Sequence, residues 1–109
     1  MVTIVKGEDK TFTLQFMTPT ARMTLVGVTA AEMRLPHNNG TGVISETLAA
    51  GAITVTDAAN GELTVTVDKT NSALLKLGPI SGEIILDYGS TRKIFQLKDQ
   101  FVVESRLLP

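Results

Sequence analysis

Thr11-Phe12-Thr13-Leu14-Gln15-Phe16 is the stretch that decides the fold, because apolar and polar residues alternate in it without interruption. An extended strand points successive side chains to opposite faces, so this pattern places Phe12, Leu14 and Phe16 in one buried row while the threonines face water. Threonine and phenylalanine are both frequent in strands. The stretch therefore predicts a β-strand with one buried face.

The same two-residue period recurs along most of the chain. Ala31, Met33 and Leu35 alternate with charged residues in a segment that ends at Pro36, which has no amide hydrogen for a ladder. Similar patterns predict further strands, at the N-terminus around Ile4 and at Val43–Leu48, Ile53–Val55, Leu63–Val67, Gly82–Asp87, Arg92–Leu97 and Phe101–Glu104. We expect seven to nine strands in all.

Turn-forming residues separate these strands. The Asn-Gly pair that ends Asp57-Ala58-Ala59-Asn60-Gly61 is a strong signal for a hairpin turn. The stretch His37–Gly42 has the same chemistry, since Asn and Gly accept the positive φ of tight turns. We also predict a tight turn at Tyr88–Thr91.

One segment, Lys69–Gly78, has apolar residues three and four apart and predicts a short helix. Asp68 or Thr70 is the candidate N-cap, Gly78 can take the left-handed position after the helix, and Pro79 prevents its continuation. The apolar side chains of this helix are expected to close one open end of the sheet pair; they are Ala73, Leu74 and Leu77.

Together these elements indicate one all-β domain over residues 1–109. Short, evenly spaced strands with one crossover helix are typical of an antiparallel β-sandwich of immunoglobulin-like size, with a small barrel as the alternative. The chain has no cysteine and no tryptophan, so a likeness to antibody domains would be one of architecture.

Composition argues against several classes of function. Ten basic and eleven acidic residues give a net charge of −1, and the densest basic spot is Arg92–Lys93, so we expect no nucleic-acid partner. No apolar run approaches the roughly 20 residues of a membrane span, and Met1–Lys10 is too polar for a signal peptide, so we expect no membrane partner. The absence of cysteine excludes thiolate metal sites.

No stretch carries a catalytic motif. The single histidine, His37, is interpreted as an exposed loop residue, and Asp57 with Asn60 as a turn in preference to a calcium loop. Strand alternation predicts that the three carboxylates most open to a catalytic interpretation are scattered and solvent-facing; they are Glu32, Glu46 and Glu83. We therefore predict no enzyme, with no catalytic residue, cofactor or metal site.

The chain ends are the more informative places for partners, because exposed strand edges and apolar tails add to a neighbour's sheet. The alternative is that both ends pair within the domain's own sheets. On the first hypothesis the predicted partner contacts, which include a tyrosine at a hairpin tip, are Ile4, Val5, Tyr88, Phe101, Val103, Leu107 and Leu108.

Four pairs of segments follow one another in a definite order: Lys6–Asp9 before Thr11–Phe16, Leu25–Ala30 before Ala31–Leu35, Asp57–Gly61 before Glu62–Val67, and Thr70–Gly78 before a paired-strand finish. In this order the chain resembles the immunoglobulin-like domain of phage baseplate upper proteins and related prophage tail proteins.

This resemblance implies a non-catalytic structural adaptor of a phage or prophage virion, assembled in the cytoplasm of the bacterial host. Its expected partners are other tail proteins and itself, in a homo-oligomer such as a trimer or hexamer. The alternative function is a glycan-binding or cell-surface-binding module that uses Tyr88 and the loop from His37 to Thr41.

Overall fold

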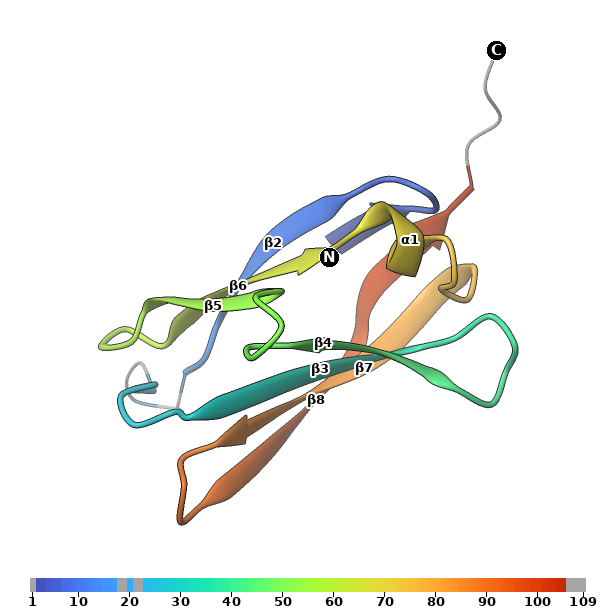
Figure 1. Cartoon of the computed structure of the whole chain (residues 1–109). Coiled ribbons are helices and arrows are strands. Elements are labelled where there is room, and N and C mark those ends of the chain that lie inside the picture. The colour runs from blue at the N-terminus through green and yellow to red at the C-terminus, as the bar shows by residue number, and fades with distance from the viewer. Residues whose placement is uncertain (1, 18–19, 21–22, 106–109) are drawn as a thin grey trace.

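The computed structural model describes residues 2–17, 20 and 23–105, and the chain is almost entirely β (Figure 1). Its elements in chain order are β1 (Val2–Val5), β2 (Lys10–Gln15), β3 (Ala30–Pro36), β4 (Val43–Thr47), β5 (Ile53–Asp57), β6 (Glu62–Val67), α1 (Lys69–Ser72), β7 (Gly78–Asp87) and β8 (Arg92–Glu104). The prediction of an all-β sandwich with seven to nine strands and one short helix is confirmed, with eight strands among the described residues.

The strands form two sheets that pack face to face. One has five strands in the order β1-β8-β7-β3-β4, and the other has three in the order β2-β6-β5 (Figure 1). Within the described residues neighbouring strands are antiparallel except β1, which runs parallel to β8 from Val2 beside Phe101 to Val5 beside Glu104. The first and last strands of the domain are therefore neighbours.

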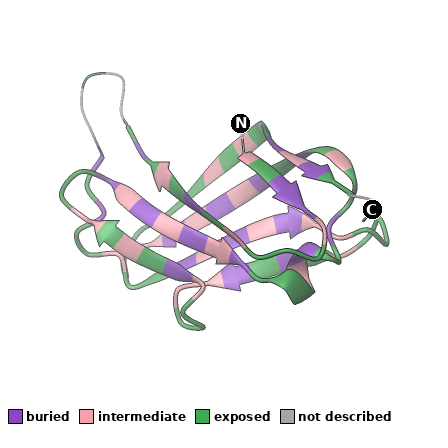
Figure 2. Cartoon of the chain, turned by 90° about the horizontal axis from the view of Figure 1, so that it is seen from above, coloured by how far each residue is buried: buried purple, intermediate pink, exposed green. Residues whose placement is uncertain are grey.

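The alternation seen in the sequence becomes two buried rows. Along β2 and just after it, Phe12 and Phe16 are buried, Leu14 is half-buried, and Thr11 and Thr13 are exposed. Figure 2 shows the same banding of buried and less buried residues along most strands. These rows meet between the sheets and form one hydrophobic core.

Two aromatic contacts join the sheets across this core. The ring of Phe12 lies edge-on to that of Phe101, with centroids 5.5 Å apart. The ring of Phe16 lies tilted against that of Phe95, with centroids 5.1 Å apart. Because each pair links the β2 segment to β8, these four side chains fix the last strand of one sheet over the first strand of the other. Such pairs contribute about 0.5–1.5 kcal/mol each beyond the burial of their area.

The last two strands are longer than the sequence predicts. Strand β7 begins at Gly78 instead of Gly82, and the two predicted segments Arg92–Leu97 and Phe101–Glu104 form the single strand β8. An irregular register between Leu97 and Phe101, where three residues oppose one on β7, explains the apparent break. Such a bulge interrupts the two-residue period while the strand continues.

Helix α1 is much shorter than predicted and ends at Ser72. Asp68 caps it, with its carboxylate accepting the Asn71 N–H at 2.7 Å. Beyond the helix the backbone pairs with the end of β3, where Asn38 N–H donates to the Leu74 carbonyl at 2.8 Å. This pairing turns Leu75 into the core, so the prediction that Ala73, Leu74 and Leu77 close the sandwich is wrong; all three are exposed.

Ser72 fastens α1 to the connection between β1 and β2. Its side chain is fully buried, and its hydroxyl oxygen accepts the Gly7 N–H at 3.0 Å. The same hydroxyl lies 2.8 Å from the Glu8 carbonyl oxygen, to which it donates. One small side chain thus satisfies two backbone groups of a distant loop.

We expect Ser72→Ala to lower the free energy of unfolding by about 1–3 kcal/mol, because it leaves the Gly7 N–H and the Glu8 carbonyl without their partner. Urea unfolding followed by circular dichroism measures the change. Ser90→Ala, at an exposed turn position, is the matched control and should lose much less. Equal losses in the two variants would contradict the role given to Ser72.

Gly61, at the turn between β5 and β6, is required by both its conformation and its surroundings. Its φ is +73°, a value that suits glycine. A Cβ atom there would lie 2.1 Å from the Met23 carbonyl oxygen and 2.7 Å from that of Phe16. The Gly61 carbonyl also accepts the Phe16 N–H at 2.8 Å, so the turn is packed directly against the segment after β2.

Gly61→Ala should therefore destabilise the domain by more than about 2 kcal/mol, from backbone strain and from collision with fixed carbonyls. Gly51→Ala separates the two causes, since Gly51 has φ +84° but nothing within 4 Å of an added Cβ. It should lose only about 1–2 kcal/mol. The comparison is made by chemical denaturation, and a Gly61→Ala loss no larger than the Gly51→Ala loss would disprove the packing argument.

Candidate functional site

The strand segments at both ends of the chain are occupied by each other. The side chains of Ile4, Val5, Phe101 and Val103 are buried in the core, and β1 pairs with the end of β8. The prediction that these four residues contact a partner is therefore wrong, because their side chains are buried inside the domain. The alternative prediction, that the ends pair within the domain's own sheets, holds for the described residues; Leu107 and Leu108 lie outside them.

Tyr88 is also used within the domain. It is half-buried, its hydroxyl donates to the Thr24 carbonyl at 2.9 Å, and burial raises the pKa of its phenol. The Lys93 ammonium lies 5.8 Å from the centre of its ring. The tyrosine thus anchors the β7–β8 turn to the segment after β2, and its hydroxyl is already engaged.

The pairing of β1 leaves half of β8 uncovered. Strand β1 reaches only Phe101–Glu104, while β7 pairs with β8 along nearly its whole length. In the part of the chain that the structure describes, no strand pairs with Arg92–Leu97 on the side opposite β7. We call this segment the free edge. It lies near the β7–β8 turn, at the lower end of the molecule in Figure 1.

The register determines which backbone groups of the free edge are available. Tyr88 N–H donates to the Thr91 carbonyl at 2.7 Å and closes the hairpin. Residue pairs of an antiparallel ladder alternate between hydrogen-bonded and non-hydrogen-bonded positions. The backbone N–H and C=O groups of Lys93 and Phe95 therefore point toward β7. It follows that Arg92, Ile94 and Gln96 direct their N–H and C=O groups away from β7, as a strand edge open to pairing requires.

The side chains of the free edge are unusual for a solvent-facing strand. Ile94 is 56% exposed although it is large and apolar. On the other face Phe95 and Leu97 are only half-buried and border the core. Arg92, Lys93 and the adjacent Lys98 are exposed, which gives this end of β8 a positive charge.

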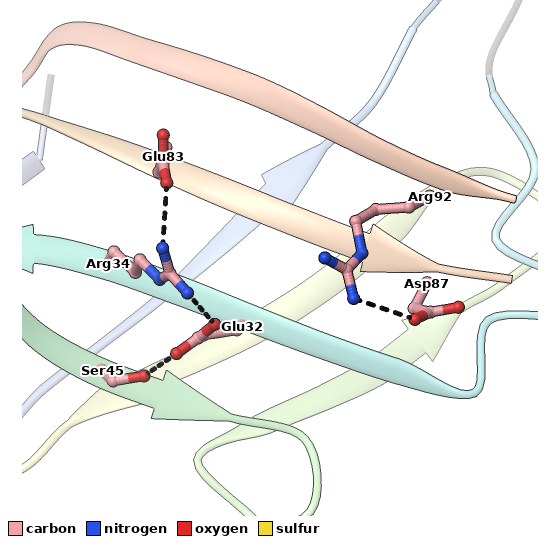
Figure 3. A network of polar contacts seen from close by, with 6 residues as sticks. All are labelled: Glu32, Arg34, Ser45, Glu83, Asp87 and Arg92. Carbon is pink, nitrogen blue, oxygen red and sulfur yellow. Dashed lines mark hydrogen bonds and ion pairs between the residues drawn. The ribbon is translucent and has the colours of Figure 1, made fainter. Parts of the chain in front are cut away.

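The outer face of the five-stranded sheet, which is turned away from the three-stranded sheet, carries a network of charges (Figure 3). Arg34 lies between two carboxylates, 3.1 Å from Glu32 and 3.7 Å from Glu83. Ser45 donates a short hydrogen bond to Glu32. This bond lowers the pKa of Glu32 the most, and the hydrogen bond from Arg34 lowers it further. The network joins β3, β4 and β7 in one row.

A second ion pair lies beside this network, where Arg92 of β8 is 3.7 Å from Asp87 of β7 (Figure 3). Between the two sets of charges the surface is hollowed to about 360 Å³. Apolar side chains of the hollow include Ala30, Ala49 and Ile85. The outer face thus offers a mixed-charge surface that continues to the free edge.

Glu46 departs from the prediction of scattered, solvent-facing carboxylates. Its side chain is only 5% exposed, and its Oε1 accepts a hydrogen bond from Asn71 Nδ2 at 2.6 Å. Burial raises the pKa of Glu46. The hydrogen bond from Asn71 acts to lower this pKa, and the nearby Asp68 carboxylate acts to raise it. Alternation with the buried Ile44 is the signal in the sequence that places it inward.

The three carboxylates singled out from the sequence therefore do not converge. Glu32 and Glu83 meet at Arg34 on the outer face, whereas Glu46 points inward beside α1. Among the described residues no group of three or more His, Asp or Glu side chains is placed to hold a metal ion. No helix in the described segments is long and apolar enough to cross a membrane.

The two loop candidates are built as turns. His37 is half-buried, whereas the sequence predicts an exposed residue. Its Nδ1 accepts a hydrogen bond from the Asn39 N–H at 3.0 Å. Asp57 accepts the Asn60 side-chain amide at 2.8 Å and the Asn60 backbone N–H at 3.3 Å. Their polar atoms hold the loops in shape, in agreement with the turn interpretation.

Comparison with known proteins gives no family for this chain. A scan against protein-family models finds no match, and a search of curated proteins finds no similar sequence. The candidate site is the free edge with the adjoining outer face.

We expect Glu46→Gln to be more stable than the unmodified protein at pH 7. The folded domain holds the Glu46 proton more tightly than the unfolded chain does, so the ionised carboxylate destabilises the fold above its raised pKa. This penalty disappears as the pH falls toward the ordinary carboxyl range, and the glutamine oxygen keeps the Asn71 bond. Thermal unfolding across pH 4–8 measures the difference.

Glu104→Gln is the control, because Glu104 is exposed. The stability advantage of Glu46→Gln should shrink on acidification, while the control should stay close to the unmodified protein throughout. A Glu46→Gln variant that is less stable at pH 7 would show that the carboxylate stabilises the fold.

Proposed function

We propose that this domain is a non-catalytic structural adaptor of a phage or prophage virion, acting through protein–protein contacts. The observation that carries the proposal is the free edge, a six-residue segment of β8 in which alternate residues have open backbone groups and Ile94 is exposed. Such an edge accepts a strand from another chain through main-chain hydrogen bonds. Contacts of this kind connect protein components and require no catalysed reaction.

The order of the strands supports the immunoglobulin-like part of the resemblance. In immunoglobulin sandwiches one sheet contains strands D, E and B, and the other contains C, F and G with C′ added beside C in variable domains. We assign the immunoglobulin letters to the present strands in chain order, so that β2 is B and β8 is G. The sheet β2-β6-β5 then corresponds to B-E-D, and the strands β8-β7-β3-β4 correspond to G-F-C-C′. This agreement supports the sandwich that the resemblance to phage tail domains implies.

The outer face suits contact between copies of the chain in a trimer or hexamer. Its acids and arginines are interspersed, so one copy can present acids where the next presents arginines. A stable contact needs roughly 1,000 Å² or more of total buried area, more than a six-residue edge supplies. The outer face therefore supplies the area for contacts between copies, and the adjoining edge is left for a different component.

A glycan-binding module has less support. That alternative relied on Tyr88 as an exposed platform for stacking on a sugar. Tyr88 is half-buried, Lys93 lies over its ring, and its hydroxyl is bonded to Thr24. In the second part of that proposed site, the loop from His37 to Thr41, His37 Nδ1 and Asn39 Oδ1 accept backbone hydrogen bonds of the loop's own turn.

The virion role is tested by inducing the producing bacterium, purifying particles on a density gradient and assaying them for this protein by mass spectrometry. We expect the protein in intact particles at a copy number that is a multiple of three. Light scattering of the purified protein at high micromolar concentration should show an oligomer. A monomer that is absent from every particle fraction would overturn the proposal.

A further inference from the structure

We propose that the free edge binds an extended segment of a different protein, with alternating acidic and apolar side chains. The proposal rests on the adaptor function above and specifies the chemistry of its partner. The bound segment would occupy the place beside β8 that β1 leaves empty, in line with β1, and would extend the five-stranded sheet along Arg92–Leu97.

The backbone supplies the first requirement. Arg92, Ile94 and Gln96 direct their N–H and C=O groups toward the open side, at the spacing that a paired strand needs. The irregular register after Leu97 ends this ladder before β1 begins. The free edge therefore offers room for a strand of about six residues, a common length for strands.

The inner row supplies the apolar half of the pattern. Phe95 packs on Phe16, yet it and Leu97 are only half-buried, and no described strand pairs with β8 on their outer flank. An added strand would place its inward side chains directly beside these two. Apolar residues at alternate positions of the partner would complete the burial.

The positive charge around the free edge favours acidic side chains in the partner. Arg92, Lys93 and Lys98 are exposed at or next to the free edge. Among the described carboxylates, Asp87 forms an ion pair with one of these residues, at 3.7 Å from Arg92. The Arg92 side chain is 65% exposed in this pair. In the bound ladder the acidic side chains between the apolar ones would lie in the outer row beside Arg92, whereas Lys93, in the inner row with Phe95, and Lys98 would add to the attraction as the segment approaches.

The same charges disfavour a second copy at this position. If two free edges pair antiparallel about Ile94, Lys93 of one copy lies diagonal to Lys93 of the other, at roughly 7–8 Å. The two ammonium groups repel each other across this diagonal, which weakens the ladder. Contacts between copies are therefore assigned to the outer face and the free edge to a different chain.

The test uses a blocked nine-residue peptide of alternating valine and glutamate, titrated into the ¹⁵N-labelled protein. We expect the amides of Ile94 and Gln96 to shift and their hydrogen exchange to slow. A peptide with lysine in place of glutamate should bind about tenfold more weakly. Equal binding of the two peptides, or shifts confined to other strands, would overturn the proposal.

Two sets of variants separate backbone from charge. Ile94→Pro removes an edge N–H that β7 does not use, so the domain should fold and lose the peptide. Lys93→Glu with Lys98→Glu should reverse the preference between the two peptides. Lys69→Glu with Lys76→Glu, exposed residues at and after α1, is the matched control and should leave it unchanged. Unaltered preference in the Lys93 and Lys98 variant counts against the proposal.

The outcome is independent of the particle assay. Selective binding of the acidic peptide by a protein absent from virions would leave this inference standing and remove the virion role. A virion protein that ignores both peptides would retain its role and lose this inference. A dimer abolished by Ile94→Pro would assign the free edge to a second copy and overturn the choice of partner.

Discussion

The contact between the phenylalanines of the β2 segment and those of β8 is the interaction on which the rest of the structure depends. Phe12 with Phe101 and Phe16 with Phe95 fix β8 over the opposite sheet along much of its length. With β8 held in this way, its inner row closes the core, and its other face and one flank remain toward solvent. The bulge after Leu97 then divides the strand between β1 and the free edge.

The architecture was largely predictable because a two-residue period records burial directly. Met33, Leu35, Leu63 and Val65 are all fully buried where alternation places them. The α1 segment was not predictable in the same way. Its leucine spacing fits a helix, but backbone pairing with Asn38 straightens the chain after Ser72 and reverses which leucine is buried. A long-range bond overrides local periodicity there.

The candidate site was mostly beyond the sequence for a related reason. Alternation indicates which face a residue occupies, but it does not indicate which strands are neighbours. Ile4 and Phe101 look like partner contacts until β1 and β8 are seen to pair, and only that pairing shows that Arg92–Leu97 is uncovered. The one local sign was Ile94, an isoleucine in a row with arginine and glutamine.

The parallel pairing of β1 with β8 also constrains how the protein is made. Strand β1 is synthesised before every other strand of this domain, and its partner, residues 101–104, is synthesised after them. Until then Ile4 has no sheet to join, and the five-stranded layer lacks its two outermost members on that side. Sequence-distant pairings of this kind slow folding and leave nascent edges open to aggregation, so the domain completes its fold only after β8 has been synthesised.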